Sequence, residues 1–152
     1  PIGIDFSAGM LAAAATDAPL VRADALRLPI PDSHVDGITC GFALRNFKDL
    51  NSFFHEISRV VRPGGRIGLL EVGQPSHPLL RWGHRVYFGT LIPKIGALLS
   101  DADAYSYLPK SVDYLPESEK MLTELRVAGF TDVTRIPLDG GITQLFLGTQ
   151  GT

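Results

Sequence analysis

The feature that most constrains the fold is an alternation of short apolar runs with helix-like segments in the first half of the chain. Runs of strand type occupy residues 1–5, 20–24, 35–42 and 66–72. Helical patterns lie at 7–15 and 49–61, and the second has apolar residues at helical spacing: Leu50, Phe53, Phe54, Ile57, Val60 and Val61. Strands that alternate with helices form parallel sheets with right-handed crossovers, so the sequence predicts an α/β fold.

The third run, 35–42, is β-branched and apolar, of the kind that is buried on both faces of a sheet. Ser7 is the expected N-cap of the first helix, and the segment Arg-Pro-Gly-Gly at 62–65 is expected to end the second. Single-domain organisation over residues 1–152 is predicted, because no repeat or low-complexity linker occurs.

The pattern changes after Gln74. Residues 76–100 form a long apolar, helix-like stretch, interrupted by basic residues and therefore not a membrane span. Residues 116–130 are an amphipathic helix ended by Gly129, with Met121, Leu122, Leu125 and Ala128 on its apolar face. Residues 132–150 are predicted to form two antiparallel strands joined around Asp139-Gly140-Gly141.

Charge and cysteine content exclude several classes of function. Fourteen basic and 16 acidic residues give a net charge of −2 without a basic run, which argues against a nucleic-acid partner. The single cysteine, Cys40, excludes a disulfide framework and favours the cytoplasm. The four histidines (His34, His55, His77 and His84) lack metal-ligand spacing, so no metal site is expected.

Polar residues follow the predicted strands, where open α/β sheets bind ligands. The carboxylate of Asp5 suits the two hydroxyls of a nucleotide ribose, or else it simply lies at a helix N-terminus. Asp24 and the backbone N–H of Ala25 suit an adenine ring, although Asp24 also fits a turn. Met10 could flank the adenine face or pack in the core. Arg45 and Asn46 follow the third strand; the alternative to a catalytic role is a loop arginine paired with Asp49 or Glu71.

Six segments taken together are characteristic of one family. They are GIDFSAGML (3–11), ADALRLPIPD (23–32), GFALRNFKDL (41–50), RVVRPGGRIGLLE (59–71), AYSYLPKSV (104–112) and DGGI (139–142). In this order they resemble the class I S-adenosylmethionine-dependent methyltransferases, and more narrowly the UbiE family of demethylmenaquinone and polyprenyl-benzoquinol C-methyltransferases. The Leu-Arg-Asn and Tyr-x-Tyr-Leu-Pro-x-Ser elements are specific to this family.

The resemblance implies a Rossmann-like fold, S-adenosyl-L-methionine as cofactor and a prenylated quinol as substrate. It makes Asp5 the ribose ligand, Asp24 and Ala25 the adenine contacts, and Gly41 a neighbour of the methionine part, where the family usually has serine. Arg45 and Asn46 become catalytic: the guanidinium stabilises phenolate charge while the carboxamide orients the ring or a water that accepts the proton.

The same resemblance makes residues 76–112 a substrate cover that can touch a membrane surface, with Trp82, Tyr105 and Tyr107 near the substrate. The alternative is a helix that closes the core, with tyrosines that only pack. The oligomeric state is not implied.

Two departures from the family pattern have consequences. The chain opens at the family's second strand, so the central first strand and the glycine-rich loop of the order 3-2-1-4-5-7-6 are not in this sequence. Strands two and three then lack a neighbour that joins them to the rest, and these 152 residues alone are expected to bind the cofactor poorly and fold incompletely. The ending GGITQLFLGTQ lacks the histidine and Tyr-Lys of the quinone enzymes, which argues against a quinone substrate but not against methyl transfer.

Three other functions stay open at this point. The first is a methyltransferase that acts on another small aromatic or lipid-like acceptor. The second is a nucleotide-binding oxidoreductase, since Asp5 would also serve NAD; the Arg-Pro-Gly-Gly hinge and the antiparallel last strands argue against it. The third is a non-catalytic remnant.

Overall fold

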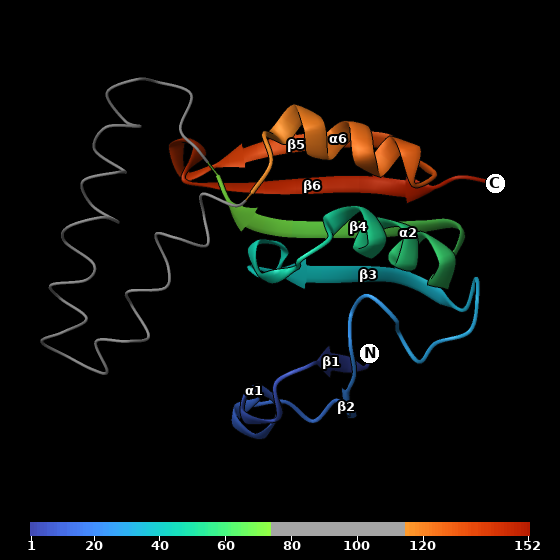
Figure 1. The fold of residues 1–152 in the computed structure, drawn as a ribbon, viewed down its shortest axis with the longest axis vertical. Helices are drawn as coiled ribbons and strands as arrows, with labels where there is room; N and C mark the ends of the chain where they lie inside the picture. Colours follow the sequence, from blue (N-terminus) through green and yellow to red (C-terminus); the bar gives the residue numbers. More distant parts are fainter. Residues whose placement is uncertain (74–114) are drawn as a thin grey trace, which may run out of the picture.

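The computed structural model describes residues 1–73 and 115–152, and its strands form two separate sheets (Figure 1). The smaller sheet pairs β1 (Gly3–Asp5) with β2 (Leu20–Arg22) in parallel. The larger sheet has the order β3-β4-β6-β5, in which β3 and β4 are parallel and the last two pairs are antiparallel. The predicted α/β class, with a separation between the second and third strands of the chain, is confirmed.

The larger sheet consists of β3 (Val35–Gly41), β4 (Val61–Val72), β5 (Phe130–Leu138) and β6 (Thr143–Gln150). The short 3-10 helix η3 (Asp139–Gly141) joins β5 to β6, so the predicted antiparallel pair is confirmed. Gly140 adopts a φ of 68° in this connection, in the left-handed region where a glycine carries no steric penalty.

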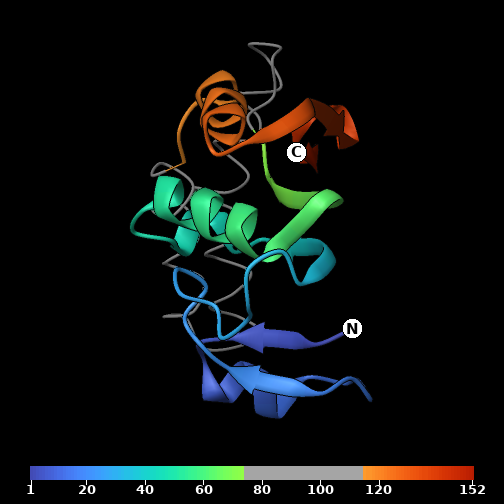
Figure 2. The same cartoon turned by 90° about the vertical axis from the view of Figure 1, so that its right-hand side faces the viewer.

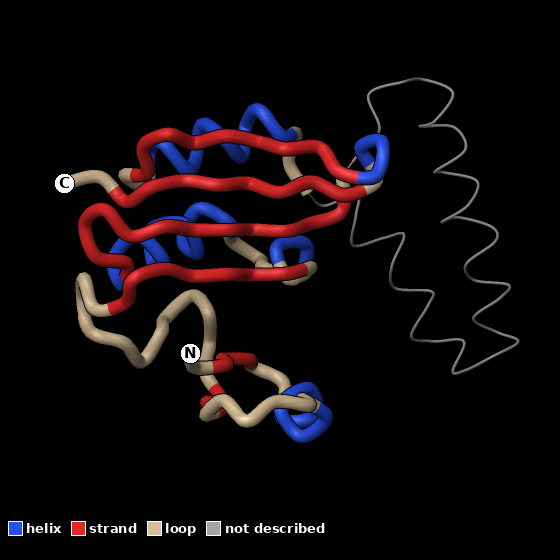
Figure 3. Tube along the Cα trace, turned by 180° about the vertical axis from the view of Figure 1, so that it is seen from behind, coloured by secondary structure: helices blue, strands red, loops and turns tan. Residues whose placement is uncertain are grey.

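Two helices cover one face of this sheet: α2 (Leu50–Val60) and α6 (Ser118–Val127). Both lie on the same side of the strands, and the view from behind shows the opposite face with no described helix over it (Figures 2 and 3). The buried core between helices and sheet contains Leu44, Phe53, Phe54, Ile57, Val60, Val61, Ile67, Leu69, Met121, Leu122, Leu125, Ala128, Phe130, Val133 and Phe146. The apolar faces predicted for both helices are therefore the ones that are buried.

Two expectations about strands are wrong in the described part of the chain. β3 is not buried on both faces: it is an edge strand whose residues are exposed or half-buried, since described helices cover only one face of its sheet. α2 ends at Val60, directly before the Arg-Pro-Gly-Gly segment as expected, but β4 begins at Val61 rather than at residue 66 and includes this segment. Val61 already pairs with Val35, and the register shifts before Arg66 pairs with Gly37.

The smaller sheet carries α1 (Ala8–Ala13), for which Ser7 is the N-cap as predicted. The Ser7 hydroxyl accepts a hydrogen bond of 3.3 Å from the Met10 N–H. Residues 23–34, called the connecting loop below, lead from β2 to β3. The arrowheads of β1, β3 and β4 point the same way in Figure 1, so their carboxyl ends lie toward one side of the molecule.

Candidate functional site

An open cavity of about 940 Å³ lies between the two sheets. Its lining comes from β1, from the connecting loop, from β3 and from the segment that follows β3. The lining includes β3 from Val35 to Cys40, so the cavity extends along the edge of that strand. Four of the predicted site residues line it together: Asp5, Asp24, Ala25 and Asn46.

Asp5 is the last residue of β1, where the chain turns into α1. Its Oδ1 accepts a hydrogen bond of 2.7 Å from the Ser7 N–H. Asp5 thus lies two residues before the N-cap Ser7 and binds its N–H, rather than lying within the first turn of α1. The same side chain lines the cavity, and this one bond occupies only one of its two oxygens.

Asp24 and Ala25 form a tight turn just past β2. The Asp24 Oδ1 accepts from the Leu26 N–H at 2.9 Å, and the Asp24 carbonyl accepts from the Arg27 N–H at 3.0 Å. The alternative of a turn aspartate is thus confirmed. The turn holds both residues at the cavity wall rather than away from it.

Met10 and Gly41 are not among the residues that line the cavity. Met10 is 62% exposed on α1, so the alternative of core packing is wrong within the described residues. Gly41 ends β3 beside open space, and a Cβ placed there would meet no described atom within 4 Å. A serine, the residue usual in the family that the sequence resembles, would fit this position without a clash.

Arg45 forms a buried ion pair with Glu71. It lies in the 3-10 helix η1 (Leu44–Asn46), which follows β3 after one turn, and Glu71 lies near the end of the neighbouring strand β4. The Arg45 Nη1 donates to the Glu71 Oε1 at 2.6 Å, and the side chains are 13% and 0% exposed. The alternative of a paired loop arginine is confirmed for Glu71. Asp49 instead caps α2.

Backbone groups complete the coordination of the Glu71 carboxylate. Its Oε2 accepts from the Arg45 N–H at 3.2 Å, and its Oε1 accepts from the Val72 N–H at 2.8 Å. The Arg45 Nε is buried and has no hydrogen-bond partner among the described residues. The guanidinium carbon lies 5.8 Å from the centre of the Phe42 ring. Charge and geometry both hold this arginine in one place.

Arg45 and Asn46, the predicted catalytic pair, differ in their position relative to the cavity. Asn46 lines the cavity, whereas Arg45 is directed to Glu71 and is not part of the lining. In the sequence Glu71 was only a candidate partner of Arg45. The signal that could have identified its role is a carboxylate at the end of an otherwise apolar strand, which needs a buried cation or several donors.

Cys40 also lines the cavity, at the end of β3 next to this pair. Burial, and secondarily the negative charge of Glu71, raise the pKa of its thiol to about 11. The thiol is therefore protonated at neutral pH, and a nucleophilic role for Cys40 is disfavoured.

Several predicted features lie outside the described residues. They are Trp82, Tyr105, Tyr107 and the whole segment 76–112. Within the described ranges, no three His, Cys, Asp or Glu side chains are grouped as metal ligands. Of the helices described, none is long and apolar enough to cross a membrane.

Comparison with known proteins assigns nearly the whole chain to one family. Residues 3–150 match the ubiE/COQ5 methyltransferase family. The demethylmenaquinone methyltransferase of Roseiflexus castenholzii is 43% identical over 139 residues, which cover 88% of this chain and 58% of that protein. The enzyme of the same name from Deinococcus radiodurans is 44% identical, over 84% of this chain and 53% of that protein.

A ubiquinone/menaquinone biosynthesis C-methyltransferase of Syntrophotalea carbinolica is 36% identical, over 98% of this chain and 66% of its own length. The chain thus spans between about half and two thirds of these three relatives.

Solved structures share the fold at low sequence identity. A phosphoethanolamine N-methyltransferase of Haemonchus contortus, solved with S-adenosyl-L-methionine, superposes with a TM-score of 0.69 at 14% identity, over 99% of this chain and 43% of that one. A SAM-dependent methyltransferase of Archaeoglobus fulgidus gives 0.66 at 12% identity, over 98% and 75%. The fold is that of the class I methyltransferases, as predicted.

Proposed function

The chain belongs to the ubiE/COQ5 methyltransferase family, and we propose that the protein containing it transfers a methyl group from S-adenosyl-L-methionine to a ring carbon of a prenylated hydroquinone. The observation that carries this proposal is the cavity that Asp5, Asp24, Ala25 and Asn46 line together. Relatives named demethylmenaquinone methyltransferase support the choice of substrate.

The chemistry of the cavity fits an adenosine group. In both Asp5 and Asp24 the Oδ1 atom accepts a hydrogen bond from a backbone N–H. The Oδ2 atom of each carboxylate can therefore accept a hydrogen bond from a ligand. Apolar side chains such as Ile4, Phe6 and Leu26 complete the wall. Asp5 would hold the ribose hydroxyls, and Asp24 and Ala25 the adenine edge. Met10 and Gly41 stay predictions as cofactor contacts.

When bound, S-adenosyl-L-methionine supplies an electrophilic methyl group on sulfur. The chain's own task is then to orient the ring and to manage the phenolic proton. Asn46, at the cavity wall, orients the ring oxygen or a water that accepts its proton. An arginine is too basic to accept this proton itself.

Arg45 acts in this proposal as a fixed dipolar group rather than as a free cation. Its pairing with Glu71 removes most of the net charge. The buried Nε–H remains a donor without a partner in the described part of the chain. Because Arg45 does not line the cavity, we expect it to act on developing phenolate charge only through the electrostatic field of this fixed pair.

Prenylated quinols reside in membranes, so the proposal includes a cytoplasmic enzyme that touches a membrane surface. We assign this contact and the substrate cover to residues 76–112, within one domain that spans 1–152. Trp82, Tyr105 and Tyr107 stay predictions as substrate contacts.

The test uses the whole protein to which this chain belongs. The protein is supplied with S-adenosyl-L-methionine that carries a deuterated methyl group and with a reduced short-chain demethylmenaquinone. Mass spectrometry should find the label on a ring carbon. Binding of the methyl donor without methylation of the quinol would point to another acceptor. Binding of NADH but not of the methyl donor would overturn the proposal.

Asn46→Ala is the matching variant. We expect kcat to fall about 100-fold with little change in donor affinity, because a group that assists proton transfer is worth at least this much. Asn51→Ala is the control, since Asn51 is an exposed residue of α2 and takes the same substitution. Equal activity of the two variants would remove Asn46 from the mechanism.

A further inference from the structure

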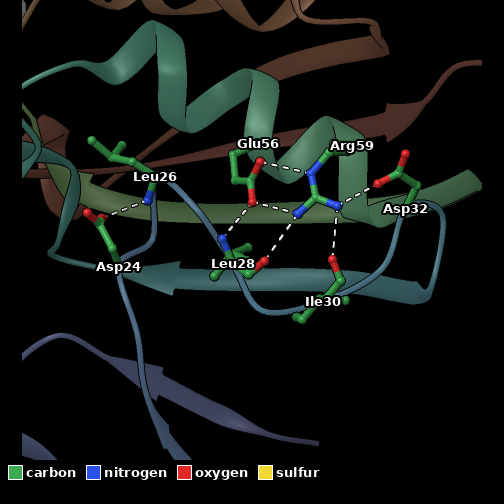
Figure 4. Close-up of polar contacts among 7 residues, drawn as sticks. All are labelled: Asp24, Leu26, Leu28, Ile30, Asp32, Glu56 and Arg59. Carbon is green, nitrogen blue, oxygen red and sulfur yellow. Dashed lines mark hydrogen bonds and ion pairs between the residues drawn. The ribbon is translucent and has the colours of Figure 1, made fainter.

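Arg59, in the last turn of α2, binds the connecting loop with its whole guanidinium group (Figure 4). Its Nε and Nη2 donate to the two oxygens of Glu56 at 2.9 and 2.7 Å. Its Nη1 donates to the Ile30 carbonyl at 2.9 Å and to Asp32 at 2.6 Å. Its Nη2 also donates to the Leu28 carbonyl at 3.2 Å. These five bonds match the five N–H groups of an arginine.

Glu56, the partner of Arg59, also binds the connecting loop directly. Its Oε1 accepts a hydrogen bond of 2.6 Å from the Leu28 N–H. The N–H and the carbonyl of Leu28 are thus both held by the Arg59–Glu56 pair, as Figure 4 shows. A surface ion pair alone contributes little, but here two charged groups bind loop backbone, and hydrogen bonds to charged groups are stronger.

This anchoring point lies directly after the turn that carries the candidate adenine contacts. The turn closes with the bond from the Arg27 N–H to the Asp24 carbonyl, and the next residue is the anchored Leu28. No residue lies between the end of the turn at Arg27 and the anchored Leu28. Among the described strands none joins the two sheets, and the connecting loop, which runs from Asp24 toward β3, is held at Leu28 and Ile30 by α2.

The electrostatics agree with a permanent pair. Hydrogen bonds from Arg59 are the main cause that lowers the pKa of Glu56, against a smaller opposing effect of burial. The Glu56 side chain is 12% exposed and that of Arg59 is 34% exposed. Asp32 is 78% exposed and adds a weaker, solvated contact.

We propose that Arg59, together with Glu56, is a positioning residue that sets where Asp24 and Ala25 meet the adenine ring, and so determines selectivity for the adenine of the cofactor. This inference rests on the proposed function. Neither side chain lines the cavity, so both act through the backbone of the loop.

The experiment measures two dissociation constants by calorimetry on the whole protein. The ligands are S-adenosylhomocysteine and S-inosylhomocysteine, in which an oxygen replaces the adenine amino group. In Arg59→Met we expect the constant for S-adenosylhomocysteine to rise about tenfold, equivalent to one or two lost hydrogen bonds. The ratio between the two ligands should fall toward one, while kcat at saturating donor stays near that of the unsubstituted protein.

Arg62→Met is the matched control. Arg62 also pairs with a carboxylate, Asp36, but both side chains are well exposed at 60% and 82%. It removes the same charge three residues away, and ligand selectivity should not change. Arg59→Lys provides a second, milder variant, because one ammonium cannot reach Glu56 and both loop carbonyls in the same geometry.

The outcomes are distinct. A folded Arg59→Met or Arg59→Lys protein with unchanged affinity and unchanged selectivity overturns the inference. An equal loss of affinity for both ligands, with no change in the ratio of the two dissociation constants, also overturns it, because such a loss indicates a general loosening of the loop. An unsubstituted protein that binds neither ligand overturns the proposed function, and the inference falls with it.

Discussion

At the scale of single residues, the site shows how a partner changes the chemistry of a side chain. An arginine after a strand end suggests a free cation for an anionic transition state. Glu71, which is fully buried on β4, neutralises that charge and accepts three hydrogen bonds from Arg45 and Val72. What remains for chemistry is a fixed dipolar group rather than a mobile charge.

Glu71→Gln should strongly destabilise the protein. It leaves the Arg45 cation buried without its counter-charge, and breaking a buried ion pair in this way costs about 3–5 kcal/mol. Urea denaturation of the whole protein measures the free energy of unfolding. The double variant Arg45→Met with Glu71→Gln is the control and should be more stable than Glu71→Gln alone. If the single variant matched the unsubstituted protein, the pair would not be formed in solution.

At the scale of elements, α2 joins the core, the connecting loop and the site. Its apolar face buries Phe53, Phe54 and Ile57, whereas Glu56 and Arg59 on another face hold the loop. Asp49 is the N-cap of the helix: its Oδ1 accepts from the Ser52 N–H at 3.1 Å and its Oδ2 accepts from the Ser52 hydroxyl at 2.6 Å. A change at this cap therefore affects the whole helix.

Asp49→Ala should lower the melting temperature at neutral pH. Hydrogen bonds from the Ser52 side chain, and then from its backbone, lower the pKa of Asp49 below its usual value. A lowered pKa in the folded state contributes stability that is present above the unfolded value of about 3.9 and is lost as pH falls through the folded value. The difference in melting temperature between Asp49→Ala and the unsubstituted chain should thus shrink in acid.

Thermal unfolding followed by circular dichroism between neutral pH and acid tests this expectation. Asp49→Ser is the control, because a serine keeps a capping oxygen without the charge and should lose less at neutral pH. A difference that stayed constant down to the most acid condition would contradict the ionised cap.

At the scale of the whole molecule, the two sheets differ in how well they are supported. The larger sheet carries the helices and the core. The smaller one has two strands of three residues each, and apolar side chains around it are exposed, among them Ile2, Phe6 and Leu20. Isolated two-stranded sheets are marginally stable, and parallel pairing is slightly weaker than antiparallel pairing.

In the 152-residue chain alone, hydrogen exchange should therefore be much faster at β1 and β2 than at β4 and β6. Backbone bonds in a weakly supported unit open locally, without global unfolding. Exchange followed by mass spectrometry on peptides measures this, with the peptides of β6 as internal reference. Equal protection of both sheets would show that the smaller one is supported as well as the larger.

The sequence by itself determined the elements: their order, the buried faces of α2 and α6, the Ser7 cap and the antiparallel β5–β6 pair all follow from local periodicity and turn chemistry. It also indicated that Asp5, Asp24, Ala25 and Asn46 would lie near one another, because residues at the carboxyl ends of strands meet at one edge; they line one cavity, and their roles stay predictions. Only the tertiary structure decided the partner of Arg45, the exposure of β3 and Met10, and the attachment of the connecting loop to Arg59. These depend on contacts between residues far apart in the chain, such as Arg45 with Glu71 and Leu28 with Glu56, which no local pattern specifies.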